Sequence, residues 1–285
     1  MTENTNPLGK YYRQPAIYIK LPSEGRYYSP EEFTPTETGE IPVFPMTAKD
    51  ELAFKTPDAM INGQGTVDCI KSCVPNLKNP WKMVNYDTDV VLLAIRLATY
   101  GENMDLHFRV PNINEQMTYT ISLPGVLEDL GKTVIKDEIT TKSGLTIGLT
   151  PLDYKTLTKV QIARFEQQKM YSTIDSSSLT EDEKQQAFNK SFETLNKVNF
   201  SLLVDSIKYI TTPDGQKVTD RKQIIEFCEN TPAKDLGEIQ DKLSDLRLQA
   251  QIPPVMMKAT EEQIKLGAPV NYEVPITFDN SNFFG

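Results

Sequence analysis

Residues 87–101 read Asp87-Thr88-Asp89-Val90-Val91-Leu92-Leu93-Ala94-Ile95-Arg96-Leu97-Ala98-Thr99-Tyr100-Gly101, and this stretch decides the fold. Apolar residues recur in it at helical spacing along one face, which consists of Val91, Ala94, Ile95 and Ala98. Acidic residues before such a run and a glycine after it are common at the two ends of a helix. The pattern therefore predicts a central core helix from 90 to 100, opened by residues 87–89.

The residues before this helix predict an extended arm followed by short helices. Residues 8–57 are rich in proline and tyrosine, with strand-like pieces at 16–21 and 41–44. Because proline removes a backbone donor, these pieces are expected as edge strands or as an arm that lies on another surface. Thr47 followed by Asp50 predicts a capped helix start. A second helix start is expected at residues 56–58 with a stop at 62–63, followed by a short helix over 66–74.

The residues after the core helix predict two hairpins and then a helical region. Alternating strands at 106–110 and 117–123 flank a turn, and residues 133–150 add a pair that turns near 142–144. Between Pro151 and Leu266 the apolar spacing is helical. We expect the helices near residues 151–171, 180–211, 219–230 and 233–250, and a last strand over 270–278.

The expected fold class is α+β, with three parts along the chain. Residues 1–150 would form the arm and a small mixed domain of helices and hairpins. An inserted helical domain would occupy 151–266. Residues 267–285 would supply a C-terminal strand and tail that pack back on the first domain.

Composition argues against several classes of protein. The 285 residues are 39% hydrophobic and 24% charged, which is enough for one large or two smaller cores. A net charge of −9 without a basic cluster disfavours nucleic acid as a partner. The longest aliphatic run, 90–95, is far shorter than the roughly 20 residues of a membrane-spanning helix. With a polar start and three cysteines, the chain is expected in a reducing cytosol with free thiols and no membrane partner.

Residue types that carry chemistry are present but sparse. His107 is the single histidine and lies on the polar side of a predicted strand, which favours a surface position over a catalytic one. Cys69 and Cys73 share a helix face, but two thiolates do not complete a zinc site, so core packing is favoured. For Asp87 and Asp89, helix capping is favoured over paired acid–base catalysis. We therefore expect no catalytic, cofactor-binding or metal-binding residues and no small-molecule substrate.

Several long motifs follow one another between residues 10 and 102. They include Lys10-Tyr11-Tyr12-Arg13-Gln14-Pro15-Ala16-Ile17-Tyr18, Gly39-Glu40-Ile41-Pro42-Val43-Phe44-Pro45, Ser72-Cys73-Val74-Pro75, Asn79-Pro80-Trp81 and Ala94-Ile95-Arg96-Leu97-Ala98-Thr99-Tyr100-Gly101-Glu102. Together they resemble the baseplate hub assembly family of T-even-like contractile-tailed bacteriophages. The resemblance implies a non-enzymatic factor that helps to build the baseplate hub, either as an assembly chaperone or as a hub component, without a cofactor.

The resemblance also implies protein partners, namely baseplate hub, tail tube or wedge proteins. The host cytoplasm during assembly is then the expected location, with the virion baseplate as the second. Tyrosine, tryptophan and arginine are the types that anchor protein interfaces, with local core packing as the alternative for each. For the C-terminal phenylalanines the alternatives are a plug in this chain's own core or in a neighbour's groove. The interface candidates are Tyr11, Tyr12, Arg13, Tyr18, Trp81, Phe283 and Phe284.

One departure from the family concerns zinc. The family that this chain resembles often carries paired-cysteine knuckles in the first hairpin and before the last strand, in a layout similar to a split zinc ribbon. Here the corresponding stretches, 109–114 and 266–271, contain no cysteine. We therefore expect a degenerate ribbon without zinc, in which the last strand returns to pair near residues 106–123.

Two alternatives to a hub assembly factor stay open. A permanent structural subunit of the virion baseplate, linking the hub to the tail tube or wedge, would suit the same acidic chain and exposed arm. A hub-associated cell-wall hydrolase would need paired acidic side chains, and no sugar-binding aromatic cleft is legible in the sequence.

Overall fold

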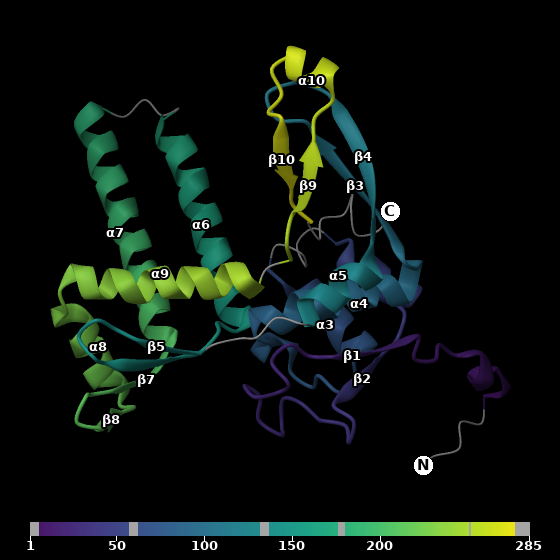
Figure 1. Ribbon diagram of the computed structural model, residues 1–285, viewed down its shortest axis with the longest axis horizontal. Coiled ribbons are helices and arrows are strands. Elements are labelled where there is room, and N and C mark those ends of the chain that lie inside the picture. Colours follow the sequence, from purple (N-terminus) through teal and green to yellow (C-terminus); the bar gives the residue numbers. More distant parts are fainter. Residues whose placement is uncertain (1–5, 57–61, 132–136, 176–179, 251, 277–285) are drawn as a thin grey trace.

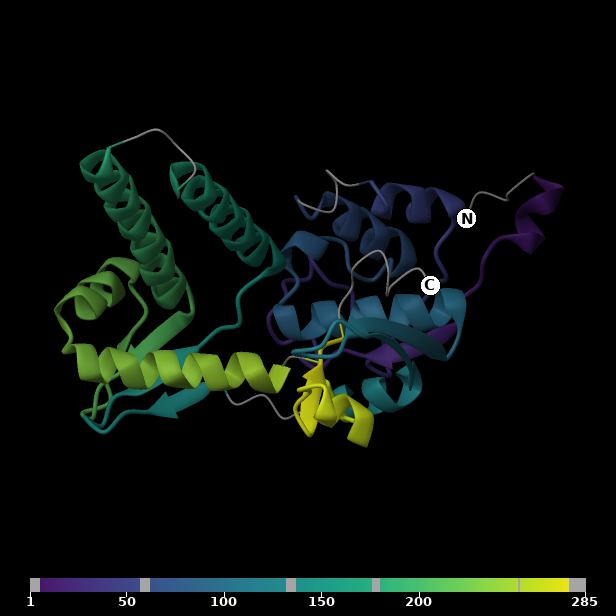
Figure 2. The ribbon, with the colours of Figure 1, turned by 90° about the horizontal axis from the view of Figure 1, so that it is seen from above.

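The computed structural model describes residues 6–56, 62–131, 137–175, 180–250 and 252–276 (Figure 1). Helices and small antiparallel sheets alternate along the chain, which confirms the expected α+β class. Two packed bodies lie side by side in both views (Figures 1 and 2). The first body contains the described residues of 6–131 together with 252–276, and the second body contains the described residues of 137–250. Each body has its own main hydrophobic core.

Helix α4 (Asn85–Tyr100) forms the centre of the first body and confirms the predicted core helix. Residues 90–95 are all buried, so the helix is covered on every side and not along one face only. The helix begins at Asn85, ahead of the predicted opening at residues 87–89, and follows Val84, which provides no side-chain cap. The expectation that Asp87 caps this helix is wrong, because its carboxylate is buried and accepts hydrogen bonds from Ser23 and Tyr28.

Short elements around α4 complete the lower part of the first body. Strands β1 (Ile17–Lys20) and β2 (Glu40–Val43) pair antiparallel and bury Ile19, Ile41 and Val43. The capping box of Thr47 and Asp50 is confirmed, since each residue's side chain accepts from the other's backbone N–H. The remaining elements are the 3-10 helices η1 (Pro7–Tyr11) and η2 (Pro80–Lys82) and the helices α1 (Ala48–Phe54), α3 (Gln64–Cys73) and α5 (Leu123–Gly131).

Two hairpins stand together above α4 and form what we term the finger (Figure 1). The first, β3 (Asn103–Arg109) with β4 (Gln116–Ser122), confirms the predicted hairpin. The second contains β9 (Val255–Lys258), α10 (Glu261–Lys265) and β10 (Asn271–Val274). Strand β10 pairs with β9 and not with residues 106–123, which corrects the expected pairing. A partner joined by a short connection costs less loop-closure entropy than one about 150 residues away.

Side-chain contacts hold the two hairpins of the finger together. The rings of Phe108 and Tyr272 lie 6.1 Å apart, and the Asn112 side chain donates to the carbonyl of Gly267 over 3.4 Å. Asn112 and Gly267 both have positive φ, at 63° and 106°. The two stretches expected to correspond to zinc knuckles therefore meet at the finger tip, where packing and a hydrogen bond join them.

Within its described residues, the second body combines one sheet with four helices. Strands β5 (Glu138–Thr140) and β6 (Thr146–Leu149) confirm the predicted pair that turns near residue 144. Strand β6 also pairs with β7 (Ile207–Thr211), which in turn pairs with β8 (Lys217–Val218). The helices are α6 (Tyr154–Asp175), α7 (Glu181–Asp205), α8 (Arg221–Asn230) and α9 (Ala233–Ala250).

The helical region is less uniform than expected. Helix α7 ends at Asp205, and residues 207–211 form a strand where helix was predicted to continue. Pairing with β6 explains this change. The register of that pairing shifts between Gly148 and Leu149, and Ile207 and Ile210 are both buried in the core of the second body. The division of the chain at residue 150 stays a prediction, although the β6–β7 pairing places residues 146–149 in the sheet of the second body.

A short segment before α4 joins the two bodies. The backbone N–H of Tyr154 donates to the carbonyl of Met83 over 2.7 Å, and that of Asn85 donates to Leu152 over 3.2 Å. Lys82 and Asp153 form an ion pair at 3.0 Å. These contacts fix the start of α4 against the start of α6. Two of the residues, Asn85 and Leu152, also line a cavity between the two bodies.

Candidate protein-interaction surface

The arm that precedes β1 leaves the first body and ends in a small folded tip. In both views η1 stands off from the helices and sheets behind it (Figures 1 and 2). Asn6 caps η1 by accepting from the backbone N–H of Leu8, and its amide donates to the Tyr12 hydroxyl over 2.9 Å. Pro7 suits the first position of the turn because it has no N–H to satisfy there. The tip is therefore ordered by its own residues.

Apolar and aromatic side chains are displayed along this arm. The exposed fractions are 61% for Leu8, 74% for Tyr11, 52% for Tyr12 and 62% for Tyr18. Tyr18 lies on the outer face of β1, opposite the buried side chain of Ile19. Large aromatic groups exposed so fully gain most when another surface covers them. We therefore define the arm surface as these four residues, three of which the sequence had predicted as interface candidates.

Arg13 does not belong to the exposed set, because it anchors the arm to the first body. Its Nη1 donates to the carbonyl of Pro45 at 2.7 Å and forms an ion pair with Asp50 at 3.2 Å. Its Nη2 donates to both the carbonyl and the hydroxyl of Ser72 at 2.8 Å. The guanidinium thus uses its fork of donors on acceptors from three separate segments of the same chain.

A buried carboxylate holds the arm at its other end. Asp87 accepts from the backbone N–H of Ser23 at 2.9 Å, from the Ser23 hydroxyl at 2.5 Å and from the Tyr28 hydroxyl at 2.5 Å. Burial raises the pKa of Asp87, and the bonds from Ser23 and Tyr28 oppose that rise. Burial and the nearby carboxylate raise the pKa of Tyr28 as well, so its hydroxyl stays a donor. Residues 13–28 are therefore fastened at both ends.

Trp81 also makes contacts within the chain. It lies half-buried in η2, with its ring 5.7 Å from the ring of Tyr154. This contact belongs to the junction between the two bodies and leaves little of the indole for another protein. Phe283 and Phe284, the remaining candidates, lie outside the described residues.

The histidine and the two cysteines considered for chemistry lie on different elements, β3 and α3. His107 is on the exposed side of β3, with Nδ1 3.0 Å from the hydroxyl of Thr118. Cys69 and Cys73 are buried free thiols in the core of the first body, as expected. Within the described ranges, no group of three or more His, Cys, Asp or Glu side chains is placed to hold a metal ion. The described helices also include none that is long and apolar enough to cross a bilayer.

Sequence reasoning missed one further exposed aromatic pair, on the helical hairpin of α6 and α7. These helices pack through the stacked rings of Tyr171 and Phe188 and through the Ser191–Gln167 hydrogen bond. Phe165 and Phe192 remain 59% and 62% exposed. Helical spacing could have indicated this for Phe165, which is two residues from Gln167 and so points away from the contact.

Comparison with known proteins identifies a family for most of the chain. The family model described as T4 bacteriophage base plate protein matches residues 17–266. Neither the curated proteins nor the solved structures contain a match to the chain. The matched range covers the second body and most of the first, and it includes Tyr18 of the arm surface. The folded tip with Leu8, Tyr11 and Tyr12 precedes the range, and β10 follows it.

Proposed function

As a member of the T4 bacteriophage base plate protein family, this chain has a structural or assembly role in the phage baseplate, and we propose that it acts in assembly of the baseplate hub through the arm surface. The expected family is thus confirmed at the level of the baseplate, and the hub is the part that we add. The observation that carries the proposal is the display of Leu8, Tyr11, Tyr12 and Tyr18 on an anchored arm.

The anchoring matters because it lowers the entropic cost of binding. A free peptide of this length would lose backbone and side-chain freedom when it docks, whereas residues 13–28 are already held by Arg13 and Asp87. Tyrosine adds contact area with few rotatable bonds. Tyr18 is therefore presented to a partner in a nearly fixed arrangement, and the tip that carries Leu8, Tyr11 and Tyr12 is joined to the chain next to the anchor at Arg13.

The proposed partners are hub, tail tube or wedge proteins of a contractile tail, met in the host cytoplasm during assembly. The proposal includes no catalytic turnover and no cofactor. An activity gel of the purified protein on peptidoglycan is the direct check of that point. Clearing of the gel would establish a cell-wall hydrolase and contradict the non-enzymatic role.

Phage complementation tests the role of the arm surface. A phage that lacks this chain is supplied with a variant in which Tyr11, Tyr12 and Tyr18 are replaced by serine, and particles are counted by electron microscopy. We expect tails without complete baseplates. The matched control is Tyr119→Ser, which removes a tyrosine that is 42% exposed on β4, outside the arm. Normal baseplates with the triple variant would refute the role of the arm.

A census of washed particles by mass spectrometry separates the two forms of the proposal. A transient assembly factor should be absent from mature particles, while a permanent subunit linking hub to tube or wedge should be present in stoichiometric copies. The exposed arm suits both forms, so the copy number decides between them.

A further inference from the structure

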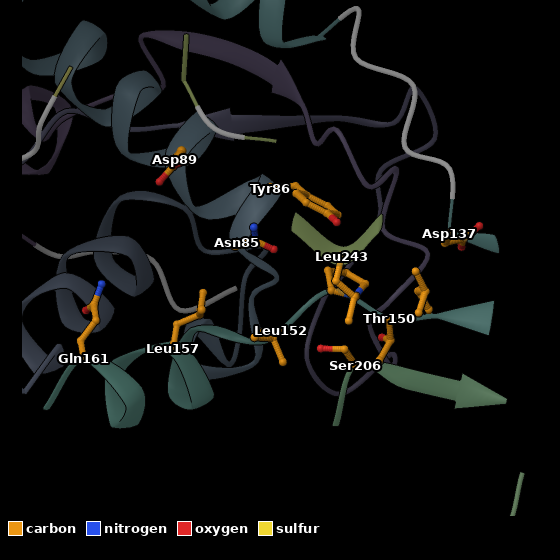
Figure 3. Close-up of a pocket in the computed structure, with 12 residues that line it drawn as sticks. Asn85, Tyr86, Asp89, Asp137, Thr150, Leu152, Leu157, Gln161, Ser206 and Leu243 are labelled. Carbon is orange, nitrogen blue, oxygen red and sulfur yellow. The ribbon is translucent and has the colours of Figure 1, made fainter. Parts of the chain in front are cut away.

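A cavity of about 260 Å³ lies where the two bodies meet (Figure 3). Side chains from α4, α6 and α9 line it, together with the segment that connects β6 to α6. Polar and aliphatic groups alternate around the lining, which includes Asn85, Asp89, Leu152, Leu157, Gln161 and Leu243.

Asp89 is the unusual member of this lining. No hydrogen bond or ion pair joins its carboxylate to any part of the chain that the structure describes. Burial alone raises the pKa of Asp89 to about 7. Asp87, two positions earlier on the same helix, differs in that three hydrogen bonds satisfy its buried carboxylate.

Asp89 is half-buried, so its unpaired carboxylate keeps only part of its hydration, which costs the folded protein free energy. An apolar or amide side chain at position 89 would fill the same space and destabilise the folded protein less. A charge that is retained at such a position is explained when a cation from outside completes the site. The cavity beside Asp89 provides the space for one.

The lining favours an organic cation over a metal ion. Asp137, the other carboxylate of the lining, lies across the cavity from Asp89 (Figure 3) and accepts from the Tyr27 hydroxyl. A divalent metal prefers several oxygen ligands around one point, and the two carboxylates are too widely placed for that. A long basic side chain fits better, because leucines can pack along its methylene stem while Asn85 offers an amide oxygen to its head group.

We propose that this cavity receives a lysine or arginine side chain of a partner baseplate protein, with the Asp89 carboxylate as its counter-ion. The kind of partner rests on the proposed function above, but the binding chemistry does not. Since the lining comes from both bodies, an inserted side chain would contact both and would fix their relative placement. A second attachment point, separate from the arm, is thus assigned to the junction.

Titration with small amides tests the cavity without any phage protein. N-acetyl-arginine amide and N-acetyl-lysine amide are added at pH 8 to the isotope-labelled full chain, and N-acetyl-glutamine amide serves as the neutral comparison. We expect saturable shifts of the Asn85 and Gln161 side-chain amide resonances with a basic amide, at millimolar Kd, and none with the neutral one. No response to either basic amide would overturn the proposal.

Two variants make the test specific. Asp89→Asn should abolish the response and remain folded, because it removes an unpaired charge, whereas the control Asp137→Asn should keep it. Binding should also be about tenfold weaker at pH 6 than at pH 8, since the carboxyl is mostly protonated at the lower pH. Tyr154, the ionisable group that senses Asp89 from α6, has a raised pKa and stays neutral throughout this range. Undiminished binding by Asp89→Asn, or loss of binding in Asp137→Asn alone, would place the cation elsewhere and overturn the assignment.

Failure of this test and failure of the proposed function are distinguishable. The amides report on the cavity alone, and the complementation experiment reports on the arm alone. If the arm variant gave complete baseplates, the proposed role of the arm would fail, while the result of the amide titration would still stand.

Discussion

Ser23 donates two hydrogen bonds to the carboxylate of Asp87, one from its backbone N–H at 2.9 Å and one from its hydroxyl at 2.5 Å. The two residues are 64 positions apart, and both are fully buried. The Tyr28 hydroxyl adds a third bond to this carboxylate and accepts from the backbone N–H of Val84. One side chain of the core helix thus fixes the path of the chain between β1 and the turn at residue 28.

Replacement of Asp87 by asparagine should destabilise the protein by about 3 kcal/mol. The amide has the same shape, but it has only one acceptor oxygen, so at least one donor from Ser23 or Tyr28 faces an NH₂ group. The measurement is urea unfolding, read as a change in midpoint at constant slope. Tyr28→Phe removes a single bond and should cost about 1–2 kcal/mol. Equal losses in the two variants would contradict the central role of the carboxylate.

Replacement of Arg13 by alanine should loosen the arm and leave the core intact. Its guanidinium holds the acceptors of Pro45, Asp50 and Ser72, so its loss should speed hydrogen exchange over residues 14–20 by roughly tenfold, equivalent to about 1.4 kcal/mol. Arg13→Lys keeps the charge without the fork of donors, so its hydrogen-exchange rates should lie between those of the wild type and the alanine variant. Unchanged exchange in the alanine variant would show that the arm is held by other contacts.

Replacement of Asp89 by asparagine should stabilise the protein, and increasingly so as pH rises. The folded-state pKa of Asp89 is about 7, above the ordinary value near 4, so between these values the folded chain keeps a proton that the unfolded chain has lost. Wild-type stability therefore falls through this range, and the variant escapes that loss. At pH 8 its advantage should approach about 4 kcal/mol. Urea unfolding of both proteins at pH 5 and pH 8 is the check, and parallel pH profiles would contradict it.

Replacement of Gly148 by alanine should destabilise the sheet of the second body by about 1–3 kcal/mol. Gly148 on β6 faces Tyr209 on β7, and an added Cβ would overlap the tyrosine ring. A double-mutant cycle with Tyr209→Ala measures the effect, because the alanine at 148 should cost far less once the ring is gone. Gly125→Ala is the control, since nothing lies within 4 Å of its added Cβ and it should be neutral or stabilising.

Local signals in the sequence predicted the elements that local physics determines. The apolar run of residues 90–95 fixed the core helix, and Thr47 with Asp50 marked the start of α1, because both patterns act within a few residues. Strand β7 was missed for the opposite reason. Residues 207–211 directly follow a 25-residue helix, and they become a strand by pairing with β6, whose partner residues lie about 60 positions earlier.

The candidate surface was predictable in part, and the limit again lies in non-local contacts. Tyr11 and Arg13 carry equal interface signals in the sequence, yet the acceptors that turn Arg13 inward come from residues 45–72. Asp87 and Asp89 likewise look alike as neighbours at a helix start. Ser23 and Tyr28, far away in the sequence, satisfy the carboxylate of Asp87, whereas that of Asp89 faces a cavity.

The finger sets an order of events during synthesis on the ribosome. Strands β3 and β4 leave the exit tunnel more than 130 residues before β9 does, and the whole second body is translated in between. At the usual elongation rates this interval lasts on the order of ten seconds. During this interval Phe108 has no Tyr272 ring to pack against, so the apolar face between the two hairpins stays uncovered until translation is nearly over.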